Sequence, residues 1–185
     1  MAIESVCVYC GAAPGKNPIY VEQATLLGKL LSKANLKLVY GGGFKGIMGA
    51  VAKSMQQNGG HVTGIIPHFL INRESSHDQL LLLNEAIFTE NMHQRKQEMF
   101  TRADAFLALP GGIGTVEEIV EIFTWSQIDQ HKKPFIFVNI NNYWDPIKVF
   151  FEHMLTEGFI TSFQDNGPLF VNNVEEVFPL LDSLK

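Results

Sequence analysis

The chain has 185 residues, of which 46% are apolar, and its 19 acidic and 14 basic residues give a formal net charge of −5. This length and composition predict one domain spanning residues 1–185 with a packed core, and they exclude a disordered chain. The acidic balance, without a cluster of Lys or Arg, argues against a nucleic-acid partner, although a local site can still attract a small anion.

The start of the chain and its cysteines bear on location and redox chemistry. Met1-Ala2-Ile3-Glu4 lacks the basic, apolar character of a signal peptide, and no apolar run approaches the roughly 20 residues that cross a bilayer. We therefore expect a cytoplasmic protein without a membrane partner. Cys7 and Cys10 are three apart in an apolar run, so they should point to opposite faces of a strand and serve a structural rather than a redox role. The six histidines show no metal-ligand spacing, so no metal is expected.

Short apolar runs alternate with segments of helical period along the chain. The runs predict strands at 5–9, 36–40, 62–66, 86–88, 105–109 and 135–139, and several are apolar almost throughout, as in covered parallel strands. Helices are expected from Asn17-Pro18 to about Ala34, and over about 46–58, 91–102, 115–130, 145–156 and 174–184. Residues 69–84 break this rhythm and predict a loop or short helix. The order indicates an α/β fold with a doubly wound, mainly parallel sheet, Rossmann-like, in three α/β/α layers.

A first glycine-rich loop, Gly41-Gly42-Gly43-Phe44-Lys45-Gly46, follows the second predicted strand. It matches G-x-G-x-x-G, a weak signal for a dinucleotide site when it stands alone. The next strand ends in Gly64-Ile65-Ile66-Pro67, without the acidic residue that would bind a ribose, which argues against NAD(P). Two interpretations stay open: a tight turn, or a backbone surface at Gly42 and Gly43 that a nucleotide approaches closely.

A second loop, Pro110-Gly111-Gly112-Ile113-Gly114-Thr115, joins the fifth predicted strand to a helix. Glycines let backbone N–H groups point at an anion, and the helix N-terminus favours negative charge there. No Gly-Lys-Ser/Thr follows, so a triphosphate loop is excluded and a single phosphate fits better. The alternative is a tight turn in which Thr115 is only an N-cap.

Arg95 and Glu118 are the candidate chemical groups. Arg95 falls beside Met92 and Met99 on the apolar side of its helix, where an arginine either meets an anion or snorkels from the edge of the core. The helix after the second loop has two apolar faces. Its sheet-covering face should hold Val116, Ile119, Val120 and Phe123, and the nearly opposite face should hold Ile122, Trp125 and Glu118. That second face should meet a partner subunit or a pocket wall, and Glu118 is either a base there or a surface glutamate.

Together these motifs resemble the Lonely Guy (LOG) family of cytokinin riboside 5′-monophosphate phosphoribohydrolases. The resemblance covers nearly the whole chain and rests on paired motifs at matching distance, Met92-His93-Gln94-Arg95-Lys96 and Pro110-Gly111-Gly112-Ile113-Gly114-Thr115-Val116-Glu117-Glu118. One departure is Ala12 in Cys10-Gly11-Ala12, where the family commonly has serine.

The resemblance implies a homodimer that releases free base and ribose 5-phosphate from a purine nucleoside monophosphate, with no metal or cofactor. It implies that Arg95 and Glu118 are the catalytic pair. It implies a nucleotide site formed by Glu74, Lys96, Gly111, Gly112, Ile113, Gly114, Thr115, Val116, Glu117 and Thr124.

Many members carry the label possible lysine decarboxylase, but no feature of this sequence suggests the pyridoxal phosphate site that such an enzyme normally needs. The alternative function is a nucleotide or molybdenum-cofactor carrier of the same fold, which would need the phosphate loop but not Arg95 and Glu118 together.

Overall fold

The described strands form one parallel sheet in the order β4-β3-β2-β1-β5-β6-β7. This computed structural model describes residues 2–160, 162–163 and 167–184. The strands are β1 (Ser5–Tyr9), β2 (Lys37–Tyr40), β3 (Val62–Pro67), β4 (Glu85–Thr89), β5 (Ala105–Ala108), β6 (Phe135–Val138) and β7 (Leu169–Val171). The helices are α1 (Ile19–Lys33), α2 (Gly46–Gln57), α3 (His77–Leu80), α4 (Met92–Arg102), α5 (Ile113–Gln127), α6 (Asp145–Thr156) and α7 (Val177–Ser183), with short 3₁₀ turns η1 (His68–Leu70) and η2 (Ile140–Asn142).

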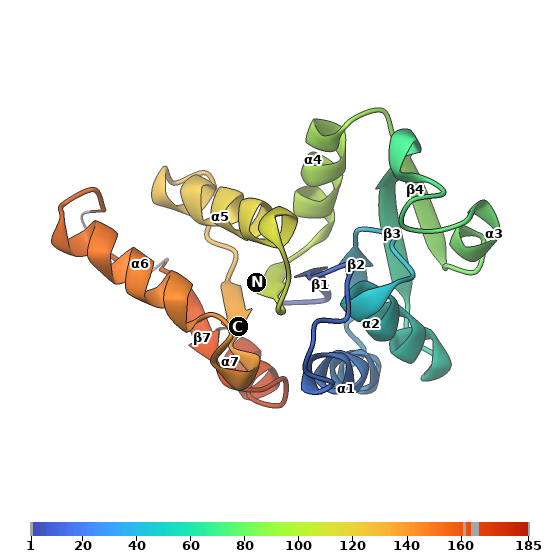
Figure 1. The fold of residues 1–185 in the computed structure, drawn as a ribbon, viewed down its shortest axis with the longest axis horizontal. Helices are drawn as coiled ribbons and strands as arrows, with labels where there is room; N and C mark the ends of the chain where they lie inside the picture. Colours follow the sequence, from blue (N-terminus) through green and yellow to red (C-terminus); the bar gives the residue numbers. More distant parts are fainter. Residues whose placement is uncertain (1, 161, 164–166, 185) are drawn as a thin grey trace.

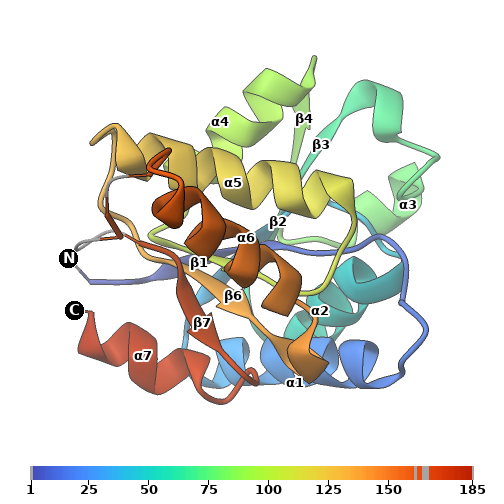
Figure 2. The same ribbon diagram turned by 60° about the vertical axis from the view of Figure 1, so that its left-hand side comes forward.

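Helices cover both faces of the sheet, which gives the three predicted layers (Figures 1 and 2). Residues of α1, α2 and α7 share one buried cluster with the strands, and residues of α4, α5 and α6 share the other. Alternation along β1 explains the division, because successive strand side chains point to opposite faces. Cys7 lies in the second cluster and Cys10 in the first, and both are buried free thiols, so the predicted placement of the pair on opposite faces is confirmed.

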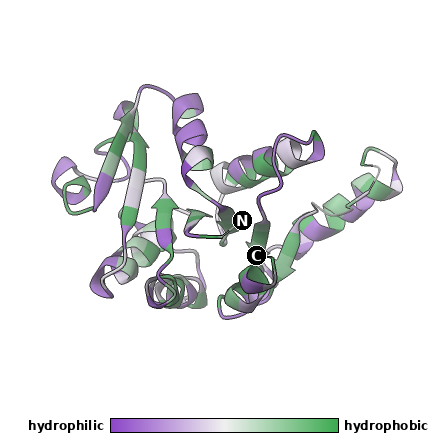
Figure 3. Ribbon diagram, turned by 180° about the vertical axis from the view of Figure 1, so that it is seen from behind, coloured by the Kyte–Doolittle hydropathy of each residue, from purple (hydrophilic) through white to green (hydrophobic). Residues whose placement is uncertain are grey.

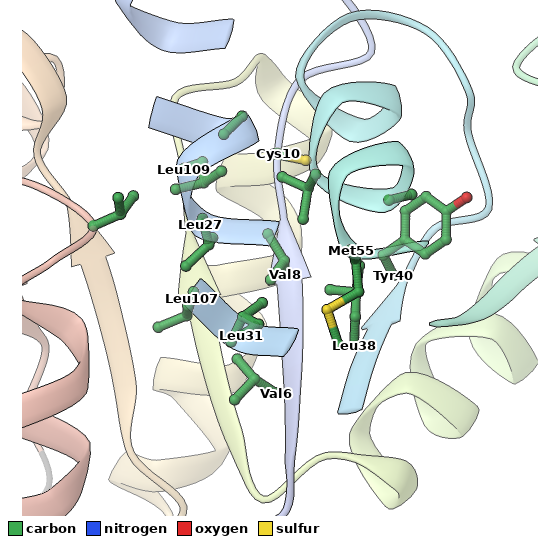
Figure 4. Close-up of a cluster of buried hydrophobic side chains, with 14 of the residues drawn as sticks. Val6, Val8, Cys10, Leu27, Leu31, Leu38, Tyr40, Met55, Leu107 and Leu109 are labelled. Atoms are coloured by element: carbon green, nitrogen blue, oxygen red, sulfur yellow. The ribbon is translucent and has the colours of Figure 1, made fainter. Parts of the chain in front are cut away.

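The face beneath α1 and α2 shows how the helical period produces this packing. Leu27 and Leu31, one turn apart on α1, lie over Val6 and Val8 of β1, and Met55 of α2 fills the space beside them (Figure 4). All five side chains are at most 1% exposed. Burying one such side chain contributes about 1.5–3 kcal/mol, so this face makes a large contribution to the stability of the fold.

The predicted fold class and all six predicted strands are confirmed, and the sequence missed β7. That strand has three residues, follows Gly167-Pro168 and is half-buried over two of them, so it carries no alternation to recognise. Residues 69–84 contain the expected short helix. This helix, α3, begins with a capping box in which Ser76 and Gln79 each bond the other's backbone N–H.

The second face predicted for α5 meets a pocket wall at Glu118, as one of the two alternatives had it, but the partner-subunit alternative is wrong for Ile122. Ile122 is 2% exposed and belongs to the same buried cluster as Ile119 and Phe123. The reason is that α4 runs beside α5 and covers its flank: the rings of Phe100 and Trp125 meet edge to face with centroids 4.9 Å apart. Figure 3 shows α5 with hydrophobic residues along its length and α4 largely hydrophilic, as expected when α5 is covered on two sides. Ile122 is therefore not available to a partner subunit, whereas Trp125 is half-buried.

The strand order reverses between β1 and β5, which places a crevice at their carboxyl ends. From β1 the chain moves through β2 and β3 to β4, then returns to the other side of β1 as β5 and continues outward (Figure 1). The loops after β1 and β5 meet here, where the Gly11 N–H donates to the Pro110 carbonyl at 3.1 Å. Among the described helices, none combines the length and apolar character that spanning a bilayer requires.

The contact between α1 and α2 predicts the effect of Gly28→Ala. A Cβ at Gly28 would collide with the Val51 carbonyl and would lie 2.8 Å from the Met55 backbone nitrogen. Alanine favours a helix by about 1 kcal/mol over glycine, but parting two packed helices costs about 1–3 kcal/mol. We therefore expect net destabilisation, measured by denaturant unfolding. Lys29→Ala, on the exposed side of α1, should change stability by less than about 0.5 kcal/mol. A Gly28→Ala protein more stable than the parent would contradict this account of the contact.

Candidate functional site

A cavity of about 350 Å³ occupies the crevice at the carboxyl ends of β1 and β5. Its walls come from the end of β1, both glycine-rich loops, α4 and the first turns of α5. A larger cavity of about 510 Å³ lies between β6, β7 and α6, but its walls are mostly apolar side chains and lysines, and neither glycine loop reaches it. The smaller cavity is the better candidate, because it lies where ligands bind in such sheets and collects buried polar groups.

The second glycine loop opens the N-terminus of α5 toward this cavity. A Cβ at Gly111 would collide with Thr115 and with Gly11, so close packing within the chain requires that glycine. A Cβ at Gly112 or Gly114 would meet nothing within 4 Å, and neither residue has a positive φ. Neither crowding nor backbone conformation therefore demands glycine at these two positions. Both line the cavity beside the first amides of the helix, which have no acceptor within the helix itself.

Glu118 lies one turn further along α5, and its carboxyl group is buried at the cavity wall. Burial raises the pKa of this carboxyl to about 7; the positive charge of Arg95 opposes the shift, and the negative charges of Glu117 and Glu74 add to it. The sequence left a surface glutamate open as an alternative, and the structure instead places Glu118 half-buried in the cavity wall. A carboxyl that titrates near neutral pH can either accept or donate a proton.

Arg95 of α4 is only 6% exposed, so it does not snorkel to solvent. One terminal nitrogen, Nη2, donates to the Gly41 carbonyl at 3.2 Å, and Nη1 lies 3.8 Å from the Met92 sulfur. Its Nε is buried without a hydrogen-bond partner, and among the described residues Arg95 forms no ion pair. A buried guanidinium with an unused donor beside a cavity is suited to an anionic or polar ligand.

The first glycine loop makes room for this arginine. A Cβ at Gly41 would collide with Nη2 of Arg95, so the glycine permits the guanidinium to reach the backbone. Gly42 has φ +76° and packs against Ile66, and Gly43 packs against Met48. Gly42 and Gly43 are buried and do not line the cavity. The internal packing of the loop thus accounts for these two glycines without a ligand.

Glu74 reaches the cavity from the segment between η1 and α3. Its backbone carbonyl accepts from the Phe44 N–H at 3.1 Å, and the Lys45 Nζ donates to the neighbouring Arg73 carbonyl at 3.2 Å. These bonds attach the segment to the first glycine loop. The Oε2 atom of Glu74 is buried without a hydrogen-bond partner, so a ligand donor in the cavity could bind it.

Lys96 neutralises acidic side chains on the flank of α5 rather than pointing into the cavity. Its Nζ lies 2.6 Å from Glu117 Oε1 and 3.0 Å from Glu121 Oε1. Burial lowers the pKa of Lys96, but the two carboxylates outweigh this effect and the pKa is raised. Lys96 therefore stays protonated and joins α4 to α5.

The structure brings half of the predicted site residues to the cavity. Those that line it are Glu74, Arg95, Gly112, Gly114, Thr115, Glu117 and Glu118. Those that lie outside its lining are Gly42, Gly43, Lys96, Gly111, Ile113, Val116 and Thr124. Ile113 is 85% exposed, and the Thr124 hydroxyl donates to the Val120 carbonyl within α5.

An apolar wall of the cavity was largely missed from the sequence. Met48 and Leu70 join Met92 and Met99 in the lining, beside the polar groups. The helical period indicated the last two, but nothing in the sequence places Met48 of α2 or Leu70 of η1 near them. Across residues 2–160, 162–163 and 167–184, no three His, Cys, Asp or Glu side chains are grouped so that they could bind a metal ion.

Comparisons with known proteins agree with the observed fold and with the family resemblance of the sequence. The family model described as possible lysine decarboxylase matches residues 48–181. The cytokinin riboside 5′-monophosphate phosphoribohydrolase LOG7 of Arabidopsis thaliana is 39% identical over 97% of this chain and 84% of its own length. LOG2 of the same plant, with the same activity in its name, is 39% identical over 96% of this chain and 85% of its length. Among solved structures, the molybdenum cofactor binding protein of Rippkaea orientalis has a TM-score of 0.73 and 19% identity, covering 100% of this chain and 98% of that one.

The fold and the cavity define a Rossmann-like α/β protein with a polar site at its topological switch point. The chain belongs to the LOG family, whose family model carries the description possible lysine decarboxylase.

The raised pKa of Glu118 predicts a pH-dependent stability. The native carboxyl keeps its proton up to about pH 7, whereas the unfolded chain loses it above its ordinary value of 4.5. The unfolded state binds fewer protons between these values, so stability falls as the pH rises through this window, by about 3 kcal/mol in total. Glu118→Gln removes this effect. The free energy of unfolding of the parent minus that of Glu118→Gln should therefore decrease by about 2–3 kcal/mol between about pH 5 and about pH 8.

Urea unfolding at a series of pH values measures this difference. Thr124→Ser, an exposed change on the same helix, should leave the pH dependence of the parent unaltered. If the difference in the free energy of unfolding between the parent and Glu118→Gln did not change with pH, the carboxyl would have its ordinary pKa.

Proposed function

We propose that this protein hydrolyses the N-glycosidic bond of a purine nucleoside 5′-monophosphate and releases the free base and ribose 5-phosphate. The observation that carries the proposal is the position of Glu118: a buried carboxyl with a pKa of about 7, facing a cavity that also holds Arg95, one helical turn from the N-terminus of α5. The relatives named above are phosphoribohydrolases of cytokinin riboside 5′-monophosphates, which supports the same reaction class here.

The N-terminus of α5 is the proposed phosphate site. Its first amides carry partial positive charge, and Gly112 and Gly114 leave open space where side chains would otherwise stand. Thr115 is buried in the first turn and lines the cavity, where its hydroxyl can donate to a phosphate oxygen. Phosphate bound here holds the substrate by a group remote from the bond that breaks, and this binding energy orients the ribose.

Glu118 is the proposed base and stabiliser of the ribosyl cation. As the bond from C1′ to the base nitrogen breaks, positive charge develops on the ribose ring, and a nearby carboxylate lowers its energy. The same carboxylate takes a proton from water as the water oxygen bonds to C1′. The base leaves with the electron pair of the broken bond and receives a proton from water, and the Glu118 carboxyl then returns its own proton to the solvent. Arg95 supplies a positive charge that stabilises the departing base or holds the ribose and phosphate in place.

The substrate class that we propose is a cytokinin-type nucleotide, an adenosine monophosphate with an apolar group on N6, or AMP itself. The apolar wall of Met48, Leu70, Met92 and Met99 supports a base with an apolar substituent. Adenine without a substituent also fits an apolar wall, so the relative rates with AMP and with a prenylated AMP decide between the two. Free base is measured for each by chromatography.

A carrier function is the second candidate, supported by the similarity of fold to a molybdenum cofactor binding protein. At 19% identity that likeness concerns the fold. A carrier would need an anion site but has no use for a buried carboxyl of raised pKa facing a buried arginine. The decarboxylase description fits poorly as well, because Lys96, at the edge of the site, is paired with two carboxylates and is not a free amine.

The homodimer implied by the family stays a prediction, as do the cytoplasmic location and the absence of nucleic-acid and membrane partners. Ile122 itself is buried within its own chain and is not available for a dimer contact, whereas Trp125 is half-buried. Sedimentation at micromolar concentration measures the assembly directly.

The first catalytic prediction concerns Glu118→Gln, which keeps the shape of the side chain and removes its basicity. Turnover should fall by about 10² or more, the usual scale for losing a general base, while nucleotide still binds because the amides of α5 are untouched. In the parent, kcat/KM should rise with pH through about 7 as the carboxyl ionises. Glu117→Gln is the matched control and should lose less, because its side chain points about 100° away around the helix. Parental turnover by a folded Glu118→Gln protein would remove this residue from the mechanism.

The second prediction tests the phosphate site with Gly114→Ala. The added methyl group meets no protein atom within 4 Å, so the melting temperature should not fall. The methyl group would instead occupy space that the phosphate needs, and affinity for the monophosphate should decrease about tenfold or more, whereas affinity for the unphosphorylated nucleoside should not change. Calorimetric titration with both ligands measures the contrast. An equal loss of affinity for both ligands would show that the phosphate binds elsewhere.

A further inference from the structure

We propose that Tyr143 is a positioning residue that holds the backbone of the phosphate loop in its binding orientation. This inference rests on the proposed function, because it assigns a role at the proposed phosphate site. Tyr143 follows η2, between β6 and α6, and lies outside the lining of the cavity. Its hydroxyl group donates a hydrogen bond to the carbonyl oxygen of Gly111 in the loop after β5.

The geometry of the peptide bond connects this contact to the cavity. The Gly111 carbonyl and the Gly112 N–H belong to one planar peptide group, and in the trans form they point in opposite directions. A hydroxyl that holds the carbonyl on one side therefore fixes the direction of the N–H on the other. Gly112 is the N-cap residue of α5 and lines the cavity, so its N–H belongs to the group of amides proposed to bind phosphate.

The loop needs such a restraint because glycines flank this peptide group on both sides. Glycine populates more backbone conformations than any other residue, so a Gly-Gly pair can rotate its shared peptide plane at little steric cost. A backbone N–H that is already oriented binds an anion more tightly than one that must be ordered on binding. The Tyr143 hydroxyl supplies that order before the ligand arrives.

The turn that carries Tyr143 is itself rigidly held. Asn141 and Asn142 have φ values of +54° and +59°, a left-handed conformation that asparagine tolerates better than most residues. The Asn139 side chain accepts from the Trp144 N–H at 2.6 Å and donates to Asp145 at 2.7 Å, which closes the turn. Strained backbone of this kind is retained where the surrounding structure fixes it and is concentrated at functional sites.

A second hydrogen bond connects the same turn to the strand that precedes the loop. The indole nitrogen of the buried Trp144 donates to the carbonyl of Ala108, the last residue of β5, at 3.1 Å. Adjacent residues 143 and 144 thus hold carbonyls on either side of Leu109-Pro110. The turn fixes the path of the chain from the end of β5 to the start of α5.

The aromatic ring of Tyr143 is supported independently of its hydroxyl. Tyr20 of α1 meets the ring edge to face at a centroid distance of 5.8 Å, and Trp144 does so at 4.9 Å. Phenylalanine should therefore keep the ring in place and remove only the hydrogen bond. Because Tyr143 is 38% exposed, water competes for the Gly111 carbonyl, and the effect on affinity should be moderate.

The test compares the parent, Tyr143→Phe and Tyr20→Phe, titrated with ribose 5-phosphate and with adenine by calorimetry. Tyr143→Phe should raise the Kd for ribose 5-phosphate about threefold to tenfold, the range expected for one hydrogen bond. Its Kd for adenine and its melting temperature should stay at the parental values, because the ring and the rest of the cavity are unchanged. Tyr20→Phe, which removes a hydroxyl from the neighbouring ring, should change neither ligand. With the nucleotide substrate, KM should rise in Tyr143→Phe while kcat changes little.

Three results would overturn the inference: parental affinity for ribose 5-phosphate in Tyr143→Phe, equal weakening of both ligands, or no binding of ribose 5-phosphate by the parent. A parent protein that binds ribose 5-phosphate but cleaves no nucleotide would refute the proposed function alone. The comparison of Kd values would still decide the role of Tyr143.

Discussion

The reversal of strand order between β1 and β5 determines where this protein can bind a ligand. Parallel strands require right-handed crossovers, so connections that leave β1 and β5 in opposite directions place their helices on opposite faces of the sheet. The two loops therefore diverge and leave their shared edge uncovered. The return from β4 to β5 then brings α4 across the second face and against α5. The arginine of one helix and the carboxyl of the other come together because of this path.

The charge balance of the cavity sets it apart from a structural ion-pair network. At the edge of the cavity, Lys96 forms ion pairs with Glu117, which lines the cavity, and with Glu121, which does not. Inside, Arg95 bonds a backbone carbonyl and keeps an unused donor, Glu74 keeps an unused acceptor, and burial works against the ionised form of Glu118. Buried polar groups without partners destabilise a fold by about 1–3 kcal/mol each. Two such atoms, Arg95 Nε and Glu74 Oε2, belong to residues that line the same cavity, which indicates that a ligand completes the hydrogen bonding there.

The fold was largely predictable from the sequence because each central strand is an apolar run of four to six residues, and each long helix carries an apolar stripe. The edge strand β7 was not predictable, since it has three residues, two of them half-buried, and they show no pattern. The two faces of α5 were visible as a pattern, but what covers the second face depends on which helix returns beside it, a property of topology rather than of local sequence.

The glycine-rich loops show the same limit of prediction from sequence. The two loops look alike as sequences, yet the first needs its glycines for Arg95, for a left-handed φ and for Met48, whereas the second leaves open space at Gly112 and Gly114. No periodicity distinguishes these cases, because the difference lies in what surrounds each missing side chain. The burial of Glu118 escaped sequence reasoning for the same reason: the contacts that desolvate it come from segments distant along the chain.

One helix carries both the proposed phosphate amides and the proposed base. Gly114 and Glu118 are four residues apart on α5, so the rise of the helix separates them by about 6 Å along its axis. An α-helix resists stretching and compression because its backbone hydrogen bonds set the rise per residue, so the helix itself fixes this separation. The helix therefore sets the distance that a substrate must have between its terminal phosphate and its C1′ atom. A nucleotide whose terminal phosphate lies further from the glycosidic carbon, such as a diphosphate or triphosphate, cannot place that phosphate at the helix N-terminus and its C1′ atom at the carboxylate together. Selection for a monophosphate would then follow from helix geometry and would need no residue that repels the longer nucleotides.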